Sequence, residues 1–101
     1  MKHSSAYVAT KAAFVSMSKT AAIELGDASI RVNMIHPGGI KMSMTTNVDY
    51  TKEQYSSVPL GRIGQPSEVA KAVSFLASDD SFYCTGTEII VDGGLTLGSH
   101  V

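Results

Sequence analysis

The sequence predicts an α/β fold that contains part of a doubly wound parallel sheet, in the order helix, strand, loop, helix, strand. Residues 5–25 and 66–78 have the composition and spacing of helices, and residues 30–36 and 87–92 are typical of strands. Residues 30–36 are apolar on both faces, which favours an interior parallel strand. A helix between two strands along the chain is the usual right-handed crossover between parallel neighbours.

The first predicted helix, residues 5–25, is rich in alanine and contains no glycine or proline. We expect Ser4 or Ser5 to cap its start, and Gly26 to take the left-handed position just past its end. Apolar residues lie nearly all round this helix. It is therefore expected to be covered on more than one face.

The next segments are a short strand and a long loop. The strand at 30–36 is followed by Pro37, Gly38 and Gly39, which end it sharply. Residues 41–58 are polar and show no period, so we expect a loop with one helical turn near 51–56. Loops of this length in compact folds are often lids or binding loops.

The second helix and strand complete the pattern. Pro66 suits the first helical position, and Glu68 suits the positive end of the helix dipole. The strand at 87–92 stops at Gly93 and Gly94. Two strands and two helices cannot cover both faces of a sheet, and the strand at 30–36 keeps one edge open. The sequence therefore predicts about half of a doubly wound fold.

The composition excludes several classes of protein. Eight basic and nine acidic residues are scattered and give a net charge of −1, so we expect no nucleic-acid partner. No apolar run approaches the ~18 residues of a membrane span, and we expect neither a membrane segment nor a signal peptide. The single cysteine, Cys84, cannot form an internal disulfide, which favours a reducing, cytoplasmic compartment. The three histidines lack metal-ligand spacing.

Tyr7 and Lys11 carry the candidate chemistry. Their spacing of four places both side chains on one face of the helix, one turn apart. A phenol has a pKa near about 10, and a neighbouring cation favours its ionised form. Such a pair can act as a general acid and base on an alcohol or carbonyl. A plain lysine stem stacked on a tyrosine ring has the same spacing and stays an alternative at this point.

Several other residues have simpler interpretations. We expect Met17 and Met34 to lie in the core, and Met42 and Met44 to contact a substrate from the loop. His36 is expected to face the turn after the first strand. The remaining expectations are a buried or half-buried thiol at Cys84, a solvated acidic helix end at Asp79 and Asp80, and a turn at 92–94.

Four segments carry a family resemblance. The run from Ser5 to Ala13, with Tyr7 and Lys11, resembles the Tyr-x-x-x-Lys helix of the short-chain dehydrogenase/reductase family. Residues 30–38 resemble the next strand of that family with its Pro-Gly turn. Residues 60–70 resemble the segment that leads into its penultimate helix, and residues 85–94 resemble its last strand. The match covers residues 4–97 and is most similar to secondary-alcohol, cyclic-alcohol and hydroxysteroid dehydrogenases.

The resemblance implies a role for each matched residue. Tyr7 would protonate the carbonyl oxygen or deprotonate the alcohol, and Lys11 would hold the nicotinamide ribose and activate the phenol. Pro37, Gly38 and Ile40 would border the nicotinamide, and the loop at 41–58 would close over substrate and cofactor. The complete enzyme would be a cytoplasmic homo-oligomer that uses NAD or NADP and interconverts an alcohol and a ketone.

The chain also departs from the family pattern. It contains neither G-x-G-x-x-G nor G-x-x-x-G-x-G, the glycine-rich turns that bind the cofactor phosphates. The family's catalytic serine precedes the tyrosine by more residues than this chain has before Tyr7, and Met42 stands where the family has a threonine. We therefore expect residues 1–101 to be the C-terminal part of such a domain, without its N-terminal cofactor-binding half. The alternative is a non-catalytic truncated chain that serves at most as a folding or oligomerisation module.

Overall fold

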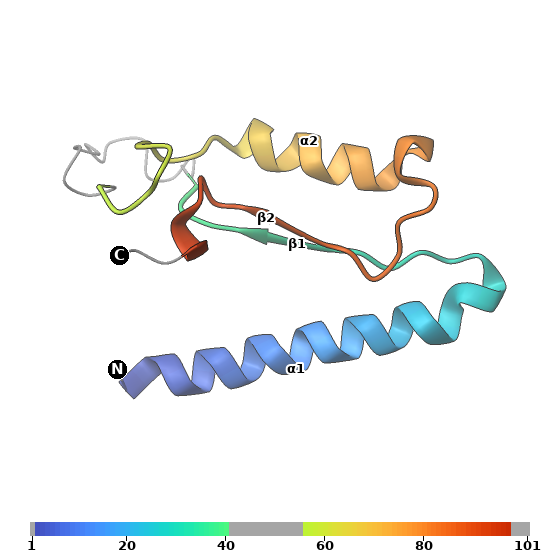
Figure 1. Cartoon of the computed structure of the whole chain (residues 1–101). Helices are drawn as coiled ribbons and strands as arrows, with labels where there is room; N and C mark the ends of the chain where they lie inside the picture. Colours follow the sequence, from blue (N-terminus) through green and yellow to red (C-terminus); the bar gives the residue numbers. More distant parts are fainter. Residues whose placement is uncertain (1, 41–55, 98–101) are drawn as a thin grey trace.

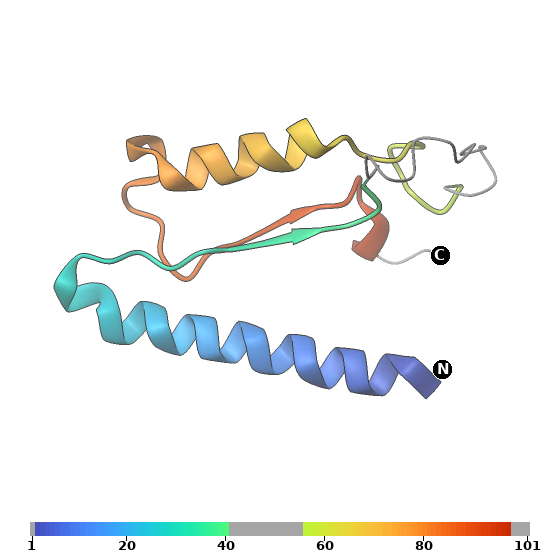
Figure 2. The ribbon, with the colours of Figure 1, turned by 180° about the vertical axis from the view of Figure 1, so that it is seen from behind.

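The computed structural model describes residues 2–40 and 56–97 and has two long helices on opposite sides of a small sheet. The main elements are α1 (Lys2–Leu25), β1 (Met34–Pro37), α2 (Pro66–Ala77) and β2 (Glu88–Val91). Helix α1 lies on one side of the two strands and α2 on the other (Figure 1), and the view from behind agrees (Figure 2). The predicted α/β order is confirmed. The predicted loop at 41–58, with its helical turn, Met42 and Met44, falls outside the described residues except for 56–58.

The two strands are parallel, as predicted. Their register pairs Met34 with Glu88 and Pro37 with Val91. The first strand begins at Met34, so the prediction of a strand from residue 30 was wrong at its start. Residues 85 and 86 lie opposite Val32 and explain this late start. The Val32 carbonyl accepts from the Gly86 N–H at 2.6 Å, and the Val32 N–H donates to the Thr85 hydroxyl at 3.1 Å. A turn therefore satisfies this backbone in place of a strand ladder.

Helix α1 differs from its prediction at both ends. It starts at Lys2, so positions 4 and 5 lie inside the helix and not at its N-terminus. At the other end a 3-10 turn (Gly26–Ala28) continues the helix, and the left-handed residue is Ser29, with φ 59°, in place of Gly26. The Ser29 N–H donates to the Gly26 carbonyl at 2.9 Å and the Ile30 N–H to the Leu25 carbonyl at 3.2 Å. These two bonds are the Schellman pattern, formed later in the chain than expected.

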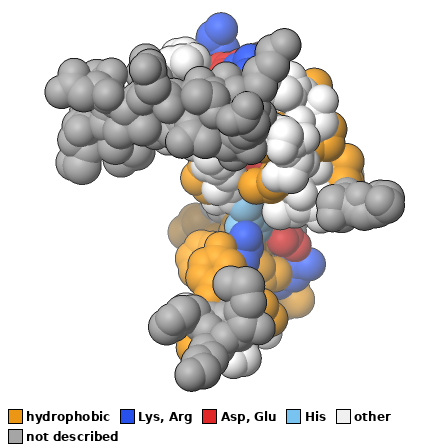
Figure 3. All heavy atoms as spheres, turned by 90° about the vertical axis from the view of Figure 1, so that its left-hand side faces the viewer, with side chains coloured by type: hydrophobic (Ala, Val, Ile, Leu, Met, Phe, Trp, Pro, Cys, Tyr) orange, Lys and Arg blue, Asp and Glu red, His pale blue; other side chains and the backbone are white. Residues whose placement is uncertain are grey.

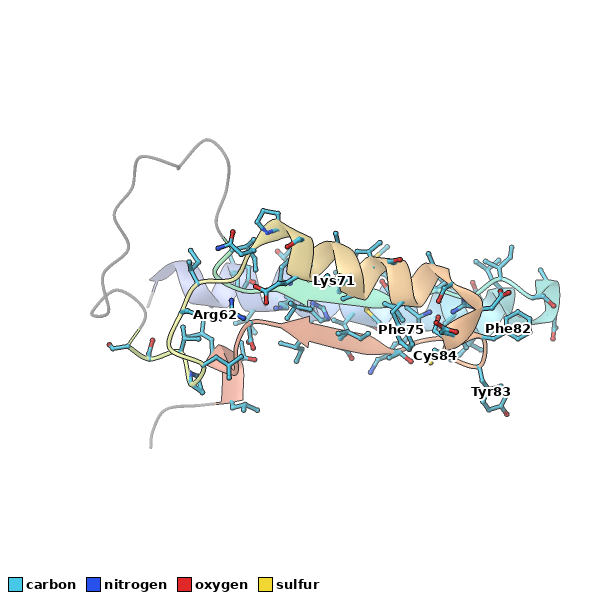
Figure 4. All side chains as sticks on the ribbon, turned by 90° about the horizontal axis from the view of Figure 1, so that it is seen from above. Arg62, Lys71, Phe75, Phe82, Tyr83 and Cys84 are labelled. Atoms are coloured by element: carbon cyan, nitrogen blue, oxygen red, sulfur yellow. The ribbon has the colours of Figure 1, made fainter. Side chains whose placement is uncertain are left out.

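Helix α2 begins as predicted, with Pro66 in its first turn. Glu68 does more there than interact with the helix dipole. Its Oε1 accepts from the backbone N–H of Gln65 at 2.9 Å, which is half of a capping box. Its two carboxylate oxygens also accept from the Arg62 guanidinium at 2.9 and 2.8 Å. Figure 4 shows Arg62 near this end of α2, with Phe82 and Tyr83 at the opposite end and Tyr83 directed away from the ribbon.

Arg31 joins the segment before β1 to the end of α2. Its guanidinium donates to the carbonyls of Leu76, Ser78, Ser81 and Cys84 and to the Ser81 hydroxyl, at 2.9 to 3.3 Å. The last carbonyls of a helix have no partner within the helix, and a cation placed there is favourable. Arg31 therefore holds α2 against the sheet. Cys84 is half-buried, as predicted.

The core of this chain is small. Among the described residues, the buried apolar side chains are Ala22 and Met34, so Met34 lies in the core as predicted. The prediction for Met17 was wrong, because 72% of its surface is exposed. The accessible surface is 7551 Å², compared with about 5,500 Å² for a compact monomer of this mass. Figure 3 shows apolar side chains exposed over the layer formed by α1.

The excess surface has a simple origin. Helix α1 has apolar residues nearly all round, and one narrow sheet can cover only a small part of them. Val8, Phe14, Met17 and Ile23 are all more than half exposed. No helix in the described part of the chain is long and apolar enough to cross a membrane.

Candidate functional site

Tyr7 and Lys11 lie together, as their spacing predicts. The Lys11 Nζ lies 5.8 Å from the centroid of the Tyr7 ring, within the range of a cation–π contact. Tyr7 is 63% exposed and Lys11 is half-buried. The phenol is therefore accessible to a ligand, and a positive charge is held beside it. Helix α1 positions both groups, because residues four apart project from the same face.

Tyr7 and Lys11 line a shallow groove that runs along α1. The groove has a volume of about 630 Å³ and follows one stripe of the helix through Val15 and Lys19 to Ile23. Its lining surface is mainly apolar. The polar groups come from Tyr7 and Lys11 towards its N-terminal end and from Ser16, Lys19 and Thr20 further along. Ligand sites commonly combine an apolar lining with a few placed polar groups.

Gly38 follows the last residue of β1 and packs directly on β2. Its N–H donates to the Val91 carbonyl at 2.9 Å. A Cβ at this position would overlap the Asp92 Cβ and lie 2.9 Å from the Asp92 Cα. The backbone at Gly38 can therefore approach β2 only because the residue has no side chain.

Ile40 lies in a second cavity. Ile40 forms a parallel bridge with Gly64, whose N–H donates to the Gly39 carbonyl at 2.9 Å. The cavity measures about 590 Å³ and also contacts Arg62, Glu68 and Thr96. Neither Tyr7 nor Lys11 lines this cavity. The start of α1 and the C-terminal ends of the strands nevertheless lie at the same end of the molecule (Figure 1).

The structure thus brings the predicted site residues together in two groups. Tyr7 and Lys11 form one group on α1. Pro37, Gly38 and Ile40 form the other, at and after the end of β1. Within the described residues the two groups do not share a cavity.

Sequence reasoning missed an ionic network between α1 and the sheet. Glu88 Oε2 lies 3.0 Å from the Lys19 Nζ, and Glu88 Oε1 lies 3.1 Å from the His36 Nε2. The hydrogen bond from Lys19 contributes most to lowering the pKa of Glu88 below its ordinary value, and His36 contributes less. The prediction that His36 faces a turn was wrong, because it lies within β1 and is only 8% exposed. Its place two residues after Met34, on the same side of the strand, was the signal that indicated burial.

The turn after β2 forms as predicted. Asp92 accepts hydrogen bonds from the Thr96 hydroxyl at 2.7 Å and from the Gly94 N–H at 2.8 Å. These bonds, the one from Thr96 first, lower the pKa of the Asp92 carboxyl. Gly93 and Gly94 have φ of 66° and 96°, which L side chains rarely adopt. Asp79 and Asp80 are exposed, as predicted.

A family model described as enoyl-(acyl carrier protein) reductase matches residues 1–96. The chain belongs to the short-chain dehydrogenase/reductase family. It is 47% identical over 94 residues to the 2,5-dichloro-2,5-cyclohexadiene-1,4-diol dehydrogenase of Sphingobium indicum, and the match covers 91% of this chain and 38% of that protein. It is 48% identical over 92 residues to the 3-alpha-(or 20-beta)-hydroxysteroid dehydrogenase of Mycobacterium tuberculosis, with 91% of this chain and 34% of that protein covered.

Solved structures of the family share this fold. Acetoin dehydrogenase from Enterobacter cloacae is 37% identical and superposes with a TM-score of 0.81, over 94% of this chain and 38% of that one. A 4-hydroxyisoleucine dehydrogenase complexed with NADH is 34% identical, with a TM-score of 0.78 over 94% of this chain and 40% of that one. The family is thus one of oxidoreductases, and the parallel pair with its helices is part of a Rossmann-like sheet. The chain spans between 34% and 38% of the length of the two curated relatives above.

Proposed function

We propose that this chain supplies the acid/base part of an NAD(P)-dependent oxidoreductase that interconverts a secondary alcohol and a ketone by hydride transfer. Tyr7 is the acid/base and Lys11 is its activator. The observation that carries this proposal is the Lys11 ammonium, held 5.8 Å from the ring of an exposed tyrosine on the same helix face. The similarity to dehydrogenases of cyclic diols and hydroxysteroids supports the substrate class.

The proton moves at the Tyr7 hydroxyl oxygen. In the reductive direction this hydroxyl donates its proton to the carbonyl oxygen of the substrate, and in the oxidative direction the phenolate takes a proton from the alcohol. The Lys11 ammonium lies 5.8 Å from the centroid of the Tyr7 ring, on the same face of α1. The exposure of Tyr7 leaves room for a substrate to approach its oxygen.

The residues present fit the nicotinamide end of a dinucleotide. The Lys11 ammonium and the Tyr7 hydroxyl are donors suited to ribose hydroxyls. Pro37, Gly38 and Ile40 lie at and after the end of β1, and the family resemblance implies that these three residues would border the nicotinamide. When bound, the nicotinamide supplies or accepts the hydride. The Gly38 N–H donates to the Val91 carbonyl, so it is not a free donor for the nicotinamide.

In the catalytic form, a segment outside these 101 residues holds the cofactor phosphates. We infer that residues 1–101 correspond to the C-terminal part of the domain, since the sequence lacks a glycine-rich phosphate turn. The exposed apolar surface of α1 supports a homo-oligomer. The single cysteine, which forms no disulfide, supports a cytoplasmic location.

A second candidate function is a non-catalytic folding or oligomerisation module. The large exposed surface and the lack of a phosphate turn favour it for the chain alone. Titrations of NADH and NADPH fluorescence, with the purified chain and with the chain joined to the N-terminal part of such a domain, distinguish the two cases. Under the module account, cofactor never binds in any context. Under the proposed function, cofactor binds only when the N-terminal part of the domain is joined to the chain.

The test is a chimera. The N-terminal part of the Mycobacterium tuberculosis hydroxysteroid dehydrogenase, up to its matched segment, is joined to the matching 92 residues of this chain. We expect the chimera to bind a nicotinamide cofactor and to oxidise hydroxysteroids, as followed by the absorbance of the reduced nicotinamide. A folded chimera that binds cofactor and transfers no hydride to any secondary alcohol or ketone tested would contradict the proposal.

A further inference from the structure

We propose that Lys19, Glu88 and His36 form a positioning network that sets helix α1, and with it Tyr7 and Lys11, relative to the end of β1. This inference rests on the proposed function, because the end of β1 carries Pro37 and Gly38, the border of the nicotinamide. The network joins three elements: Lys19 comes from α1, His36 from β1 and Glu88 from β2.

The pleat of the strands brings these groups to one face. Alternate residues of a strand point to the same side, so Met34 and His36 share a face of β1. Glu88 is the register partner of Met34 and therefore points to that side too. Because Lys19 reaches Glu88 from α1, this is the face that α1 covers. Figure 3 shows basic, acidic and histidine side chains meeting where the lower layer joins the upper one.

The network affects the orientation of α1 over the sheet more than it adds to the stability of the fold. The Lys19 and Glu88 side chains are 52% and 31% exposed, and ion pairs of this exposure contribute little net stability. Each carboxylate oxygen of Glu88 has a different partner, at 3.0 and 3.1 Å. Two partners on opposite oxygens fix the plane of the carboxylate, so Lys19 has one preferred position over the sheet. A buried His36 holds the inner end of the network in place.

Helix α1 has few other attachments to the sheet. Between described residues, the Lys19–Glu88 pair is its polar link to a strand, and Ala22 packs near Gly86. Tyr7 lies twelve residues before Lys19, or about 18 Å along the helix axis. A tilt of about 10° at Lys19 therefore moves Tyr7 by about 3 Å. A misplacement of about 1 Å can reduce the rate of a catalysed reaction about 10²-fold. The Lys19–Glu88 ion pair can therefore affect catalysis by Tyr7 through a small tilt of α1.

The network also reaches the other half of the proposed site. His36 immediately precedes Pro37 and Gly38. Lys19 lines the same groove as Tyr7 and Lys11. One set of contacts therefore spans from the acid/base helix to the strand end proposed to border the nicotinamide. Among the described residues these two parts line different cavities.

The test measures the position of α1 in the full chain. A nitroxide is attached to an Ala9→Cys variant in a Cys84→Ser background, and paramagnetic broadening of the Gly38 and Gly39 amides is read by NMR. Ala9 is exposed near the start of α1, at the same end of the molecule as these glycines. We expect this broadening to change measurably in Lys19→Met and Glu88→Gln, and to stay as in the wild type in Lys19→Arg. Lys71→Met, which removes an exposed lysine from α2, is the matched control and keeps it.

Two controls accompany this measurement. A mixture in which the nitroxide and the isotope label are on different molecules gives the broadening between copies, which is subtracted. Circular dichroism checks that each variant keeps its helix content. Unchanged broadening in folded Lys19→Met and Glu88→Gln overturns the proposal.

The chimera separates this proposal from the proposed function. If both hold, Lys19→Met lowers kcat by about tenfold or more with little change in KM for the cofactor, and Lys19→Arg restores kcat. If the chimera is active and Lys19→Met leaves kcat unchanged, the positioning role is wrong while the proposed function stands. If the chimera transfers no hydride, the broadening measurement still decides whether the network positions α1.

Discussion

Gly38 and Asp92 pack so closely that a side chain at position 38 would overlap the Cβ of Asp92. This contact joins the end of β1 to the turn after β2. We expect Gly38→Ala to lower the free energy of unfolding by about 1–3 kcal/mol, because a well-packed contact has to open. Gly26 is the matched control, since nothing lies within 4 Å of a Cβ there. Gly26→Ala, in a helical turn, should be neutral or more stable by up to about 1 kcal/mol. Urea unfolding of both variants makes the comparison, and equal effects would contradict it.

Arg31 provides a second test of the fold. Its guanidinium reaches five acceptors at the end of α2, and a lysine cannot reproduce this fork. We expect Arg31→Lys to lower the free energy of unfolding by about 2–3 kcal/mol, because part-buried carbonyls lose their donors. Arg62→Lys changes an exposed arginine in the same way and should have little effect. Thermal melts of the two variants test this, and an Arg31→Lys melt like that of the wild type would overturn it.

Glu68 predicts how stability depends on pH. Its pKa is lowered to about 2 from an ordinary 4.5, chiefly by the hydrogen bond from Arg62 and then by the Gln65 N–H. A depressed folded-state pKa contributes stability that is present above the unfolded value and is lost as the pH falls from 4.5 to about 2. NMR titration of the Glu68 carboxyl carbon measures the folded-state pKa directly.

Two variants separate the causes of that shift. Arg62→Met should move the pKa of Glu68 back towards 4.5, while the Gln65 N–H keeps part of the shift. Lys71→Met removes only a small Coulomb attraction and should move the pKa slightly. A Glu68 titration that is unchanged in Arg62→Met would show that the pair does not form in solution.

The parts that the sequence predicts well are those decided by neighbours along the chain. The spacing of Tyr7 and Lys11 within one helix was sufficient to place them on one face. Pro66 marked the start of α2 for the same reason, because its fixed φ acts locally.

The parts that the sequence missed depend on distant partners. His36 and Glu88 are 52 residues apart, and the acceptors of Arg31 lie 45 to 53 residues after it. The strand begins at Met34 because the turn near Gly86 faces Val32, which no local pattern reveals. Similarly, the left-handed residue is Ser29 because a 3-10 turn extends α1 past Gly26.

The exposed apolar surface predicts the behaviour of the chain in solution. The radius of gyration is 16.0 Å, compared with about 13 Å for a compact domain of this length. A marginal core leaves little net stability, so we expect the chain alone to self-associate and to unfold over a broad temperature range. Sedimentation velocity and circular dichroism melts check this. A monodisperse monomer with a sharp cooperative melt would show that these elements close their own core.

The central claim is that the Tyr7 hydroxyl carries the proton. Its most direct test is kcat and cofactor Kd for Tyr7→Phe in the chimera, with Tyr83→Phe as the control at an exposed tyrosine. Tyr7→Phe removes one oxygen and keeps the ring beside Lys11, so we expect kcat to fall by about 10²–10⁴-fold. Cofactor Kd should change far less, because Lys11 remains as a donor to the ribose. Tyr83→Phe should turn over like the parent chimera. A Tyr7→Phe chimera with near-normal kcat would contradict the account, and the Tyr7–Lys11 contact would then be structural only.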